Sequence, residues 1–263
     1  MIIIGEKLNS SVPKTLDALN RHDLDYVVRM IKQQELSGAD YLDLNTALTG
    51  ENEIDNMLWL IRLVKENSQC GIVIDSPNPD VIAHCLPNTK NNKTIINSIT
   101  LDGKYDAVIE MSKQYGAGVV CLPIKEKSVP NAAGERFAYA VEIAAKLRHM
   151  GIEDENIYID ILVEAIATNS MATSVALETT KLVKKEFPKI NTICGLSNVS
   201  FGLPRRAKLN GAFFIMMIQN GLDGAIVDIT SDEIKNAIFT SNALLGKDEY
   251  CMEYIAHSRK FIK

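Results

Sequence analysis

The chain lacks most of the features that mark a secreted, membrane-spanning or nucleic-acid-binding protein. Its five cysteines are odd in number and form no C-x-x-C pair, which favours reduced cysteines over a disulfide framework or a zinc site. No apolar run approaches the roughly 20 residues of a membrane span, and the apolar start "MIII" is too short for a signal peptide. The net charge of −5 is unlike that of most nucleic-acid-binding proteins. We expect a cytoplasmic protein without a nucleic-acid or membrane partner.

Several common catalytic motifs are missing as well. No G-x-G-x-x-G follows the first apolar run, which weakens the case for a dinucleotide-binding sheet. No G-x-S-x-G occurs, so Ser197 and Ser200 are poor candidates for a nucleophile. The four histidines fall in helical stretches or near the C-terminus, which removes the usual general base. Carboxylates and carboxamides remain as the polar groups to consider, and we predict no bound metal.

Eight short apolar runs, rich in β-branched residues, recur along the 263 residues. They cover residues 2–5, 41–45, 71–75, 94–98, 117–123, 157–162, 191–197 and 224–229. Between them lie stretches with helical apolar spacing, for example 26–39, 53–68, 135–151 and 171–187. Continuous apolar strands are typical of parallel sheets that are buried on both faces. The alternation predicts a single α/β domain over residues 1–263, with a (β/α)8 TIM barrel favoured over an open doubly wound sheet.

Polar side chains lie near the ends of seven of the eight predicted strands. They are Glu6, Asn9, Asp43, Asn45, Asp75, Asn97, Ser98, Asp160, Ser197, Asn198 and Asp228. In a TIM barrel, the carboxyl ends of the strands form the active site. Helix capping is the alternative role for each Asp or Asn, and the following "TSDE" favours capping for Asp228. Capping is less convincing for Asp75 and Asp160, since a charge in apolar surroundings needs a partner or a ligand.

This polar set is suited to recognition by hydrogen bonds. Carboxylates accept from N–H groups, whereas carboxamides both donate and accept. The set therefore favours a flat, nitrogen-rich heterocycle with N–H edges over a phosphate or a metal ion.

The same residues carry a resemblance to a known family. The motifs "GEKLN" (5–9), "YLDLN" (41–45), "IDS" (74–76), "INS" (96–98), "YID" (158–160) and "GLSNVS" (195–200) occur in a characteristic order. Together they resemble the methyltetrahydrofolate:corrinoid protein methyltransferases, which are similar to the folate domain of cobalamin-dependent methionine synthase and, more distantly, to dihydropteroate synthase. The similarity covers essentially the whole chain and implies a TIM barrel, in agreement with the strand pattern.

The resemblance implies a pterin-binding role for several residues. They are Asp75, Asn97, Asp160, Gly195, Ser197, Asn198 and Arg206, with Arg205 as a weaker match than Arg206. A possible further part of the site comprises Glu6, Asn9, Asp43 and Asn45. Catalysis falls to Asn198, which would lie beside N5, the atom that carries the methyl group. Its amide can donate to the N5 lone pair or accept from N5–H.

The resemblance also implies the substrates and partners. Tetrahydrofolate or 5-methyltetrahydrofolate would be a substrate, and a separate protein would carry the corrinoid, since we expect no room for a cobalamin domain in this chain. A homodimer is expected. The loop "FGLPRRAKLN" (201–210) diverges from the family pattern, which leaves the partner and the direction of transfer open. Two alternatives remain: an enzyme like dihydropteroate synthase, and a folate-binding subunit without transfer activity.

Overall fold

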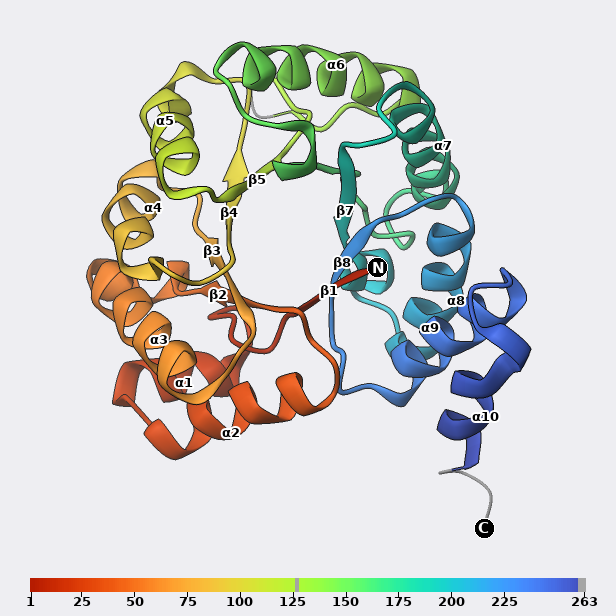
Figure 1. The fold of residues 1–263 in the computed structure, drawn as a ribbon, viewed down its shortest axis with the longest axis horizontal. Coiled ribbons are helices and arrows are strands. Elements are labelled where there is room, and N and C mark those ends of the chain that lie inside the picture. Colours follow the sequence, from red (N-terminus) through yellow and green to blue (C-terminus); the bar gives the residue numbers. More distant parts are fainter. Residues whose placement is uncertain (126–127, 260–263) are drawn as a thin grey trace.

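The computed structural model describes residues 1–125 and 128–259, and its centre is a closed barrel of eight parallel strands (Figure 1). The strands pair in chain order, and β8 pairs with β1 to close the barrel. Their bounds are β1 (Ile2–Gly5), β2 (Tyr41–Asn45), β3 (Gly71–Asp75), β4 (Thr94–Ile99), β5 (Gly118–Cys121), β6 (Ile157–Asp160), β7 (Asn191–Gly195) and β8 (Gly224–Val227). The predicted TIM barrel is confirmed.

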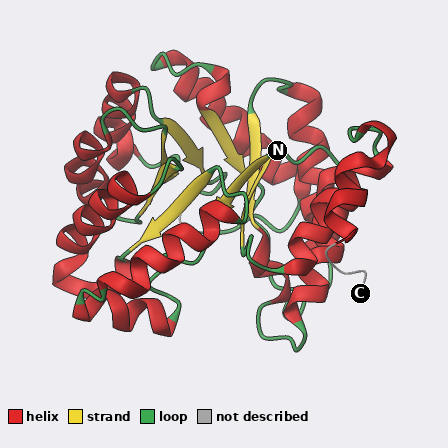
Figure 2. Ribbon diagram, turned by 60° about the horizontal axis from the view of Figure 1, so that its bottom comes forward, coloured by secondary structure: helices red, strands yellow, loops and turns green. Residues whose placement is uncertain are grey.

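Helices surround the strands on the outside of the barrel (Figure 2). They are α1 (Pro13–Arg21), α2 (Leu24–Leu36), α3 (Glu53–Asn67), α4 (Pro79–Cys85), α5 (Asp106–Tyr115), α6 (Ala133–His149), α7 (Ala172–Glu186), α8 (Arg206–Gln219), α9 (Asp232–Leu244) and α10 (Met252–Ser258). Two of them are additions to the alternating pattern: α1 lies between β1 and α2, and α10 follows α9. Across residues 1–125 and 128–259, no helix is long and apolar enough to cross a membrane.

Two apolar clusters, one on each side of the strands, form the core. The inner cluster fills the barrel with Ile4, Val73, Ile95, Val120, Tyr158 and Ile193. The outer, larger cluster includes neighbouring strand residues such as Ile72 and Ile74 together with residues of the surrounding helices. Since both faces of the strands are covered, polar side chains are accommodated mainly where the strands end. These ends therefore position the site.

Four neighbouring strands end two residues earlier than the sequence predicted. β5 stops at Cys121, β6 at Asp160, β7 at Gly195 and β8 at Val227. After β6 the chain turns at Leu162, whose φ is 58°, and after β7 it forms the short 3-10 helix η5 (Leu196–Ser200). Ser197 and Asn198 consequently lie on a helical turn beyond the strand rather than in it.

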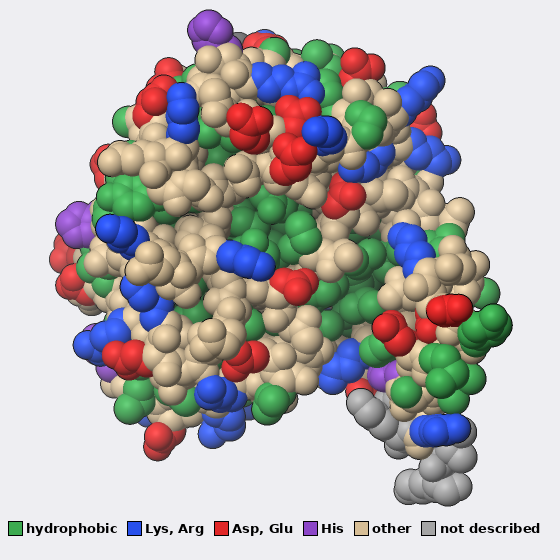
Figure 3. Space-filling view, viewed as in Figure 1, with side chains coloured by type: hydrophobic (Ala, Val, Ile, Leu, Met, Phe, Trp, Pro, Cys, Tyr) green, Lys and Arg blue, Asp and Glu red, His purple; other side chains and the backbone are tan. Residues whose placement is uncertain are grey.

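The face shown in Figure 3 mixes Lys and Arg with Asp and Glu side chains, and apolar side chains gather around the barrel axis and over α10. The exposed apolar residues in and just before α10 are Tyr250, Met252, Tyr254 and Ile255. α10 packs against α9 through the buried His257, whose ring stacks on Phe239 with 4.3 Å between the centroids. Most of the surface of α10 is therefore left exposed.

Candidate active site

A cavity of about 610 Å³ lies at the carboxyl ends of the strands. All of the predicted site residues except Asn45 line it: Glu6, Asn9, Asp43, Asp75, Asn97, Asp160, Gly195, Ser197, Asn198 and Arg206. They come from six strands or the loops that follow them, so barrel closure brings together segments that are far apart in the sequence. The volume is in the range of pockets that enclose a small organic ligand.

The buried Asp43 and the half-buried Asp75 form a pair of carboxyl groups within hydrogen-bonding reach of each other. Burial, together with the charge of Asp75, raises the pKa of Asp43 well above its ordinary value. Burial also raises the pKa of Asp75 to about 6, although Asn45 Nδ2 donates to Asp75 Oδ2 at 2.8 Å. Burial thus disfavours ionisation of both carboxyl groups at once. Asp43 Oδ1 is buried and has no partner among the described residues, so it remains available to a ligand.

Asp160, at the end of β6, is a third carboxyl group of the cavity. Its Oδ1 accepts from the backbone N–H of Leu162 at 2.7 Å. Burial raises its pKa to about 6, whereas the Leu162 hydrogen bond and the charge of Arg136 oppose the rise. At neutral pH Asp160 is thus mostly ionised, although its pKa lies only a little below the pH.

Glu6 connects the end of β1 to the turn that follows β7. Its Oε1 accepts from Ser197 Oγ at 2.9 Å. Burial is the largest cause that raises the pKa of Glu6, and the hydrogen bond from Ser197 partly offsets it. The contact fixes the position of η5, which carries Asn198.

Asn198 projects from η5 and packs against Gly195. A Cβ on residue 195 would lie 3.1 Å from Asn198 Nδ2, so glycine allows this close approach. Arg206 holds the same turn, because its Nη2 donates to Ser197 O at 2.7 Å and its Nε to Ser200 Oγ at 3.0 Å. Among the described residues, the Asn198 amide has no hydrogen-bond partner, so it is free to bind a ligand.

Carboxyl groups outnumber cations around the cavity. The two cationic side chains of its lining are Lys7 and Arg206. Lys7 Nζ lies 2.5 Å from Asp228 Oδ2, and Arg206 is engaged by η5. Lys7 is thus neutralised by a carboxylate, whereas Arg206 is held against η5 by neutral oxygen acceptors. The surroundings favour a ligand with N–H groups or with developing positive charge.

Residues 5–228 match the family model of pterin binding enzymes. The chain belongs to this family. A methylcorrinoid:tetrahydrofolate methyltransferase of Eubacterium limosum is 28% identical over 257 residues, which cover 97% of this chain and 94% of that protein. A methionine synthase of Mycobacterium tuberculosis is 29% identical over 245 residues, or 86% of this chain and 20% of that longer protein. A dihydropteroate synthase of Yersinia pestis shares the fold, with a TM-score of 0.70, 13% identity and 93% of each chain covered.

The site of this pterin-binding enzyme departs from the sequence prediction at Asp228. We expected Asp228 to cap the next helix, but this is wrong: the residue that precedes α9 is Ser231. Asp228 Oδ1 instead accepts from Thr230 N at 3.2 Å and from Thr230 Oγ1 at 2.5 Å, while Oδ2 pairs with Lys7. The pairing of β1 with β8 places Lys7 beside it, a contact that the local sequence does not reveal.

Two other residues considered from the sequence, Asn45 and Arg205, do not line the cavity. Asn45 lies behind the lining of the pterin-binding enzyme's cavity, where its amide accepts from Ser10 Oγ at 2.8 Å and donates to Asp75. Asn45 therefore orients Asp75. Arg205, the weaker match for the basic loop residue, is exposed and is not among the residues that line the cavity.

Sequence reasoning missed other parts of the pterin-binding enzyme's site. Ser11, Val12 and Pro13 line the cavity from the loop after β1, and Phe201 and Ile226 add apolar surface. Ile226 could have been found, because alternate residues of a strand point into the barrel. In the described part of the chain, no group of three or more His, Cys, Asp or Glu side chains is arranged to hold a metal ion.

Proposed function

We propose that the protein transfers a methyl group between N5 of tetrahydrofolate and the cobalt of a corrinoid carried by a separate protein. The observation that carries this proposal is the free amide of Asn198 in a cavity lined by carboxyl groups. The Eubacterium limosum relative, which matches along nearly the whole length of both chains, is named for this class of transfer. The methionine synthase match supports the same class of substrate.

Asp75, Asn97 and Asp160 bind the pterin ring in this proposal. Ionised Asp75 and Asp160 accept from ring N–H groups, and Asn97 both donates and accepts. Asp43, which lies beside Asp75, retains a buried oxygen without a partner among the described residues and supplies a further acceptor. The apolar side chains of Ile226 and Phe201 complete the cavity wall.

The reaction places positive charge on N5. Toward cobalt, N5 is protonated, the N5–methyl bond breaks, its electron pair stays on N5, and the methyl carbon bonds to Co(I). In reverse, the methyl leaves cobalt with the bond pair remaining on the metal, N5 attacks it, and the N5 proton departs. Excess carboxylates stabilise the cationic N5 in both directions.

Asn198 acts at N5 itself. Its amide oxygen accepts from N5–H when the amine is protonated, and its NH2 group donates to the lone pair when it is not. A hydrogen bond that strengthens as charge develops lowers the barrier. By analogy with a single preorganised donor, it contributes about 2–4 kcal/mol. In-line placement of methyl and cobalt supplies more.

The cavity charge distinguishes this proposal from condensation with a diphosphate leaving group. Such a group is bound best by several cations, whereas the lining has two: Lys7 is paired with Asp228, and Arg206 directs Nε and Nη2 at oxygens of η5. This observation favours methyl transfer over a reaction like that of dihydropteroate synthase. The alternative of a binding subunit without activity makes its own prediction, which is that Asn198 contributes nothing to a rate.

The proposal includes the assembly and the location of the protein. The corrinoid protein docks at the carboxyl ends of the strands, where N5 can be reached, and the enzyme is a homodimer. Light scattering of the purified protein tests the dimer. A cytoplasmic location is supported by the five free cysteines, of which four are buried.

The test follows the cobalamin spectrum in both directions, with either methylcobalamin plus tetrahydrofolate or cob(I)alamin plus 5-methyltetrahydrofolate. Asn198→Ala is compared with Asn220→Ala, a control at the far end of α8 whose amide donates to Met216 O. We expect transfer by the wild type and the control, and folate binding without efficient transfer by Asn198→Ala. Folate binding with no transfer by the wild type in either direction contradicts the proposal.

A further inference from the structure

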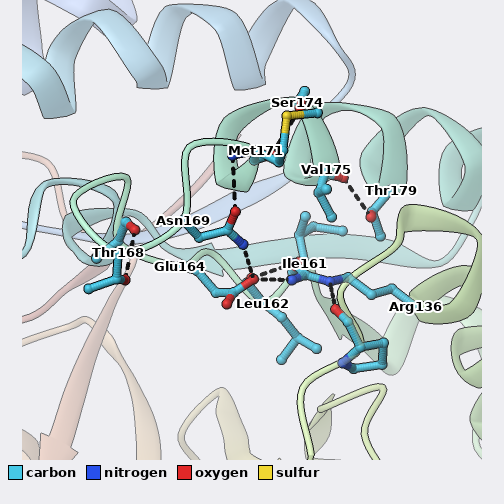
Figure 4. A network of polar contacts seen from close by, with 12 residues as sticks. Arg136, Ile161, Leu162, Glu164, Thr168, Asn169, Met171, Ser174, Val175 and Thr179 are labelled. Atoms are coloured by element: carbon cyan, nitrogen blue, oxygen red, sulfur yellow. Dashed lines mark hydrogen bonds and ion pairs between the residues drawn. The ribbon is translucent and has the colours of Figure 1, made fainter.

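A second arginine, Arg136 on α6, is fully buried outside the cavity and belongs to none of the predicted site residues. Its Nε donates to Pro130 O at 2.8 Å, and its Nη1 donates to Ile161 O at 3.1 Å and Leu162 O at 2.6 Å. Its Nη2 donates a hydrogen bond to Glu164 Oε2 and forms an ion pair with it (Figure 4). All of these partners except Pro130 lie in the loop that follows Asp160.

The Ile161–Leu162 peptide connects Arg136 to Asp160. In a trans peptide the C=O and the N–H point in opposite directions within one plane. Arg136 binds the Ile161 carbonyl on one side, so the Leu162 N–H points to the other side, where it donates to Asp160 Oδ1 at 2.7 Å. Leu162 has a φ of 58°, an uncommon value for a branched residue that needs support from its surroundings. Arg136 provides that support through the Leu162 carbonyl.

The same loop also reaches the turn that carries Asn198. Glu164 Oε2, which is held by Arg136, accepts from Asn169 Nδ2 at 3.3 Å, and Asn169 Oδ1 accepts from Met171 N at 3.0 Å, where α7 begins (Figure 4). Ile166 N donates to Val199 O in η5 at 3.0 Å. Arg136 thus anchors a loop that contacts both Asp160 and η5, the turn that carries Asn198.

Charge acts in the same direction as geometry. Three ionisable groups interact electrostatically with Asp160: Asp75 on β3, Cys194 on β7 and Arg136 on α6. Asp75 disfavours the ionised form of Asp160, while Arg136 favours it. Arg136 is the cation of this group, and its own counter-ion Glu164 is partly exposed to solvent.

We propose that Arg136 is a positioning residue for the pterin site, which orients the Asp160 carboxylate through the Ile161–Leu162 peptide and keeps it ionised for the ligand. The inference rests on the proposed role of Asp160 in binding the pterin. It assigns a function to a residue that touches neither the cavity nor the substrate.

The experiment compares Arg136→Lys and Arg136→Gln with Arg148→Gln, a control on the same helix whose partner is Asp154 near the surface. Three quantities are measured: hydrogen exchange at the Leu162 amide, the acid dissociation constant of Asp160 from carboxyl-carbon NMR, and the tetrahydrofolate Kd. The first two need no folate. They test the inference even if the wild type transfers no methyl group, which separates its failure from that of the proposed function.

Both Arg136 variants should exchange the Leu162 amide faster and bind folate about tenfold more weakly. Arg136→Gln should also lower the acid dissociation constant of Asp160 about tenfold, whereas Arg136→Lys, which keeps the charge, should change it less. Folded variants with wild-type values of all three quantities overturn the proposal.

Glu164→Gln serves if neither Arg136 variant folds. It leaves the bonds from Arg136 to the Ile161 and Leu162 carbonyls in place and removes the negative charge that opposes Arg136. We expect protection of the Leu162 amide to be kept and the acid dissociation constant of Asp160 to rise. Loss of protection, or an unchanged or lower dissociation constant, overturns the proposal.

Discussion

Replacing Asp160 with Asn should stabilise the unliganded protein while it weakens the site. The substitution keeps the size of the side chain and the oxygen that accepts from Leu162 N–H. It removes a carboxyl group whose pKa is raised from 3.8 to about 6, chiefly by burial. The native environment therefore disfavours the ionised form.

The sign and size follow from linkage between protonation and folding. A raised native pKa means that the folded protein holds the proton more tightly than the unfolded chain, so the wild type loses stability as pH rises from about 3.8 to about 6. Each unit of pKa corresponds to about 1.4 kcal/mol, which sets an upper limit of about 3 kcal/mol above pH 6. The neutral Asn avoids this loss, so we expect a gain of about 1–3 kcal/mol at pH 8 and little difference at pH 4.

Reversible denaturation of the unliganded protein at both pH values measures this difference. Asp154→Asn is a control of opposite sign, because the hydrogen bond from Arg148 lowers the pKa of Asp154 and its contribution is lost as pH falls. For a protein of this size, about 1 kcal/mol corresponds to about 2–4 °C in Tm. The reasoning is refuted if Asp160→Asn is less stable than the wild type at pH 8, or if its free energy of unfolding differs from that of the wild type by the same amount at both pH values.

Three further substitutions test the site. Asn198→Ala should slow methyl transfer by about 30- to 1000-fold, the equivalent of about 2–4 kcal/mol, with the folate Kd nearly unchanged. Stopped-flow spectroscopy measures the transfer rate and calorimetry measures the Kd. An unaltered rate argues against the role of the amide. Gly195→Ala places a Cβ 3.1 Å from Asn198 Nδ2 and should slow transfer about tenfold with little change in Tm, whereas wild-type kinetics would show that the close approach is unimportant. Asp75→Asn should weaken folate binding about 10- to 100-fold by calorimetry, and an unchanged Kd would exclude Asp75 from pterin recognition.

The sequence allowed the barrel and most of the site lining to be predicted, for a physical reason. Strands that are buried on both faces tolerate polar side chains mainly at their ends, so Asp75 and Asp160 stand out against apolar runs. The ends of β6 and β7 were harder to predict, because buried apolar residues follow both strands. They are Ile161 after β6, and Leu196 and Val199 in the helical turn η5 after β7.

Contacts between segments that are far apart in the chain could not be predicted. The pairing of Lys7 with Asp228 depends on closure of the barrel between β1 and β8. The role of Arg136 depends on the packing of α6 beside the loop after β6. A weak signal existed for Arg136, since it shares a helical face with the buried Ala140 and Ile143, where a charge requires partners.

The most direct test of the central claim follows the methyl group itself. Methylcobalamin labelled with ¹³C in its methyl group is incubated with tetrahydrofolate and the protein, and carbon NMR records where the label resides. We predict that the signal moves from cobalt to N5 of the folate, with the wild type much faster than Asn198→Ala. Label that remains on cobalt while the protein binds folate, in this assay and in the reverse assay from labelled 5-methyltetrahydrofolate, would contradict methyl transfer as the function of this site.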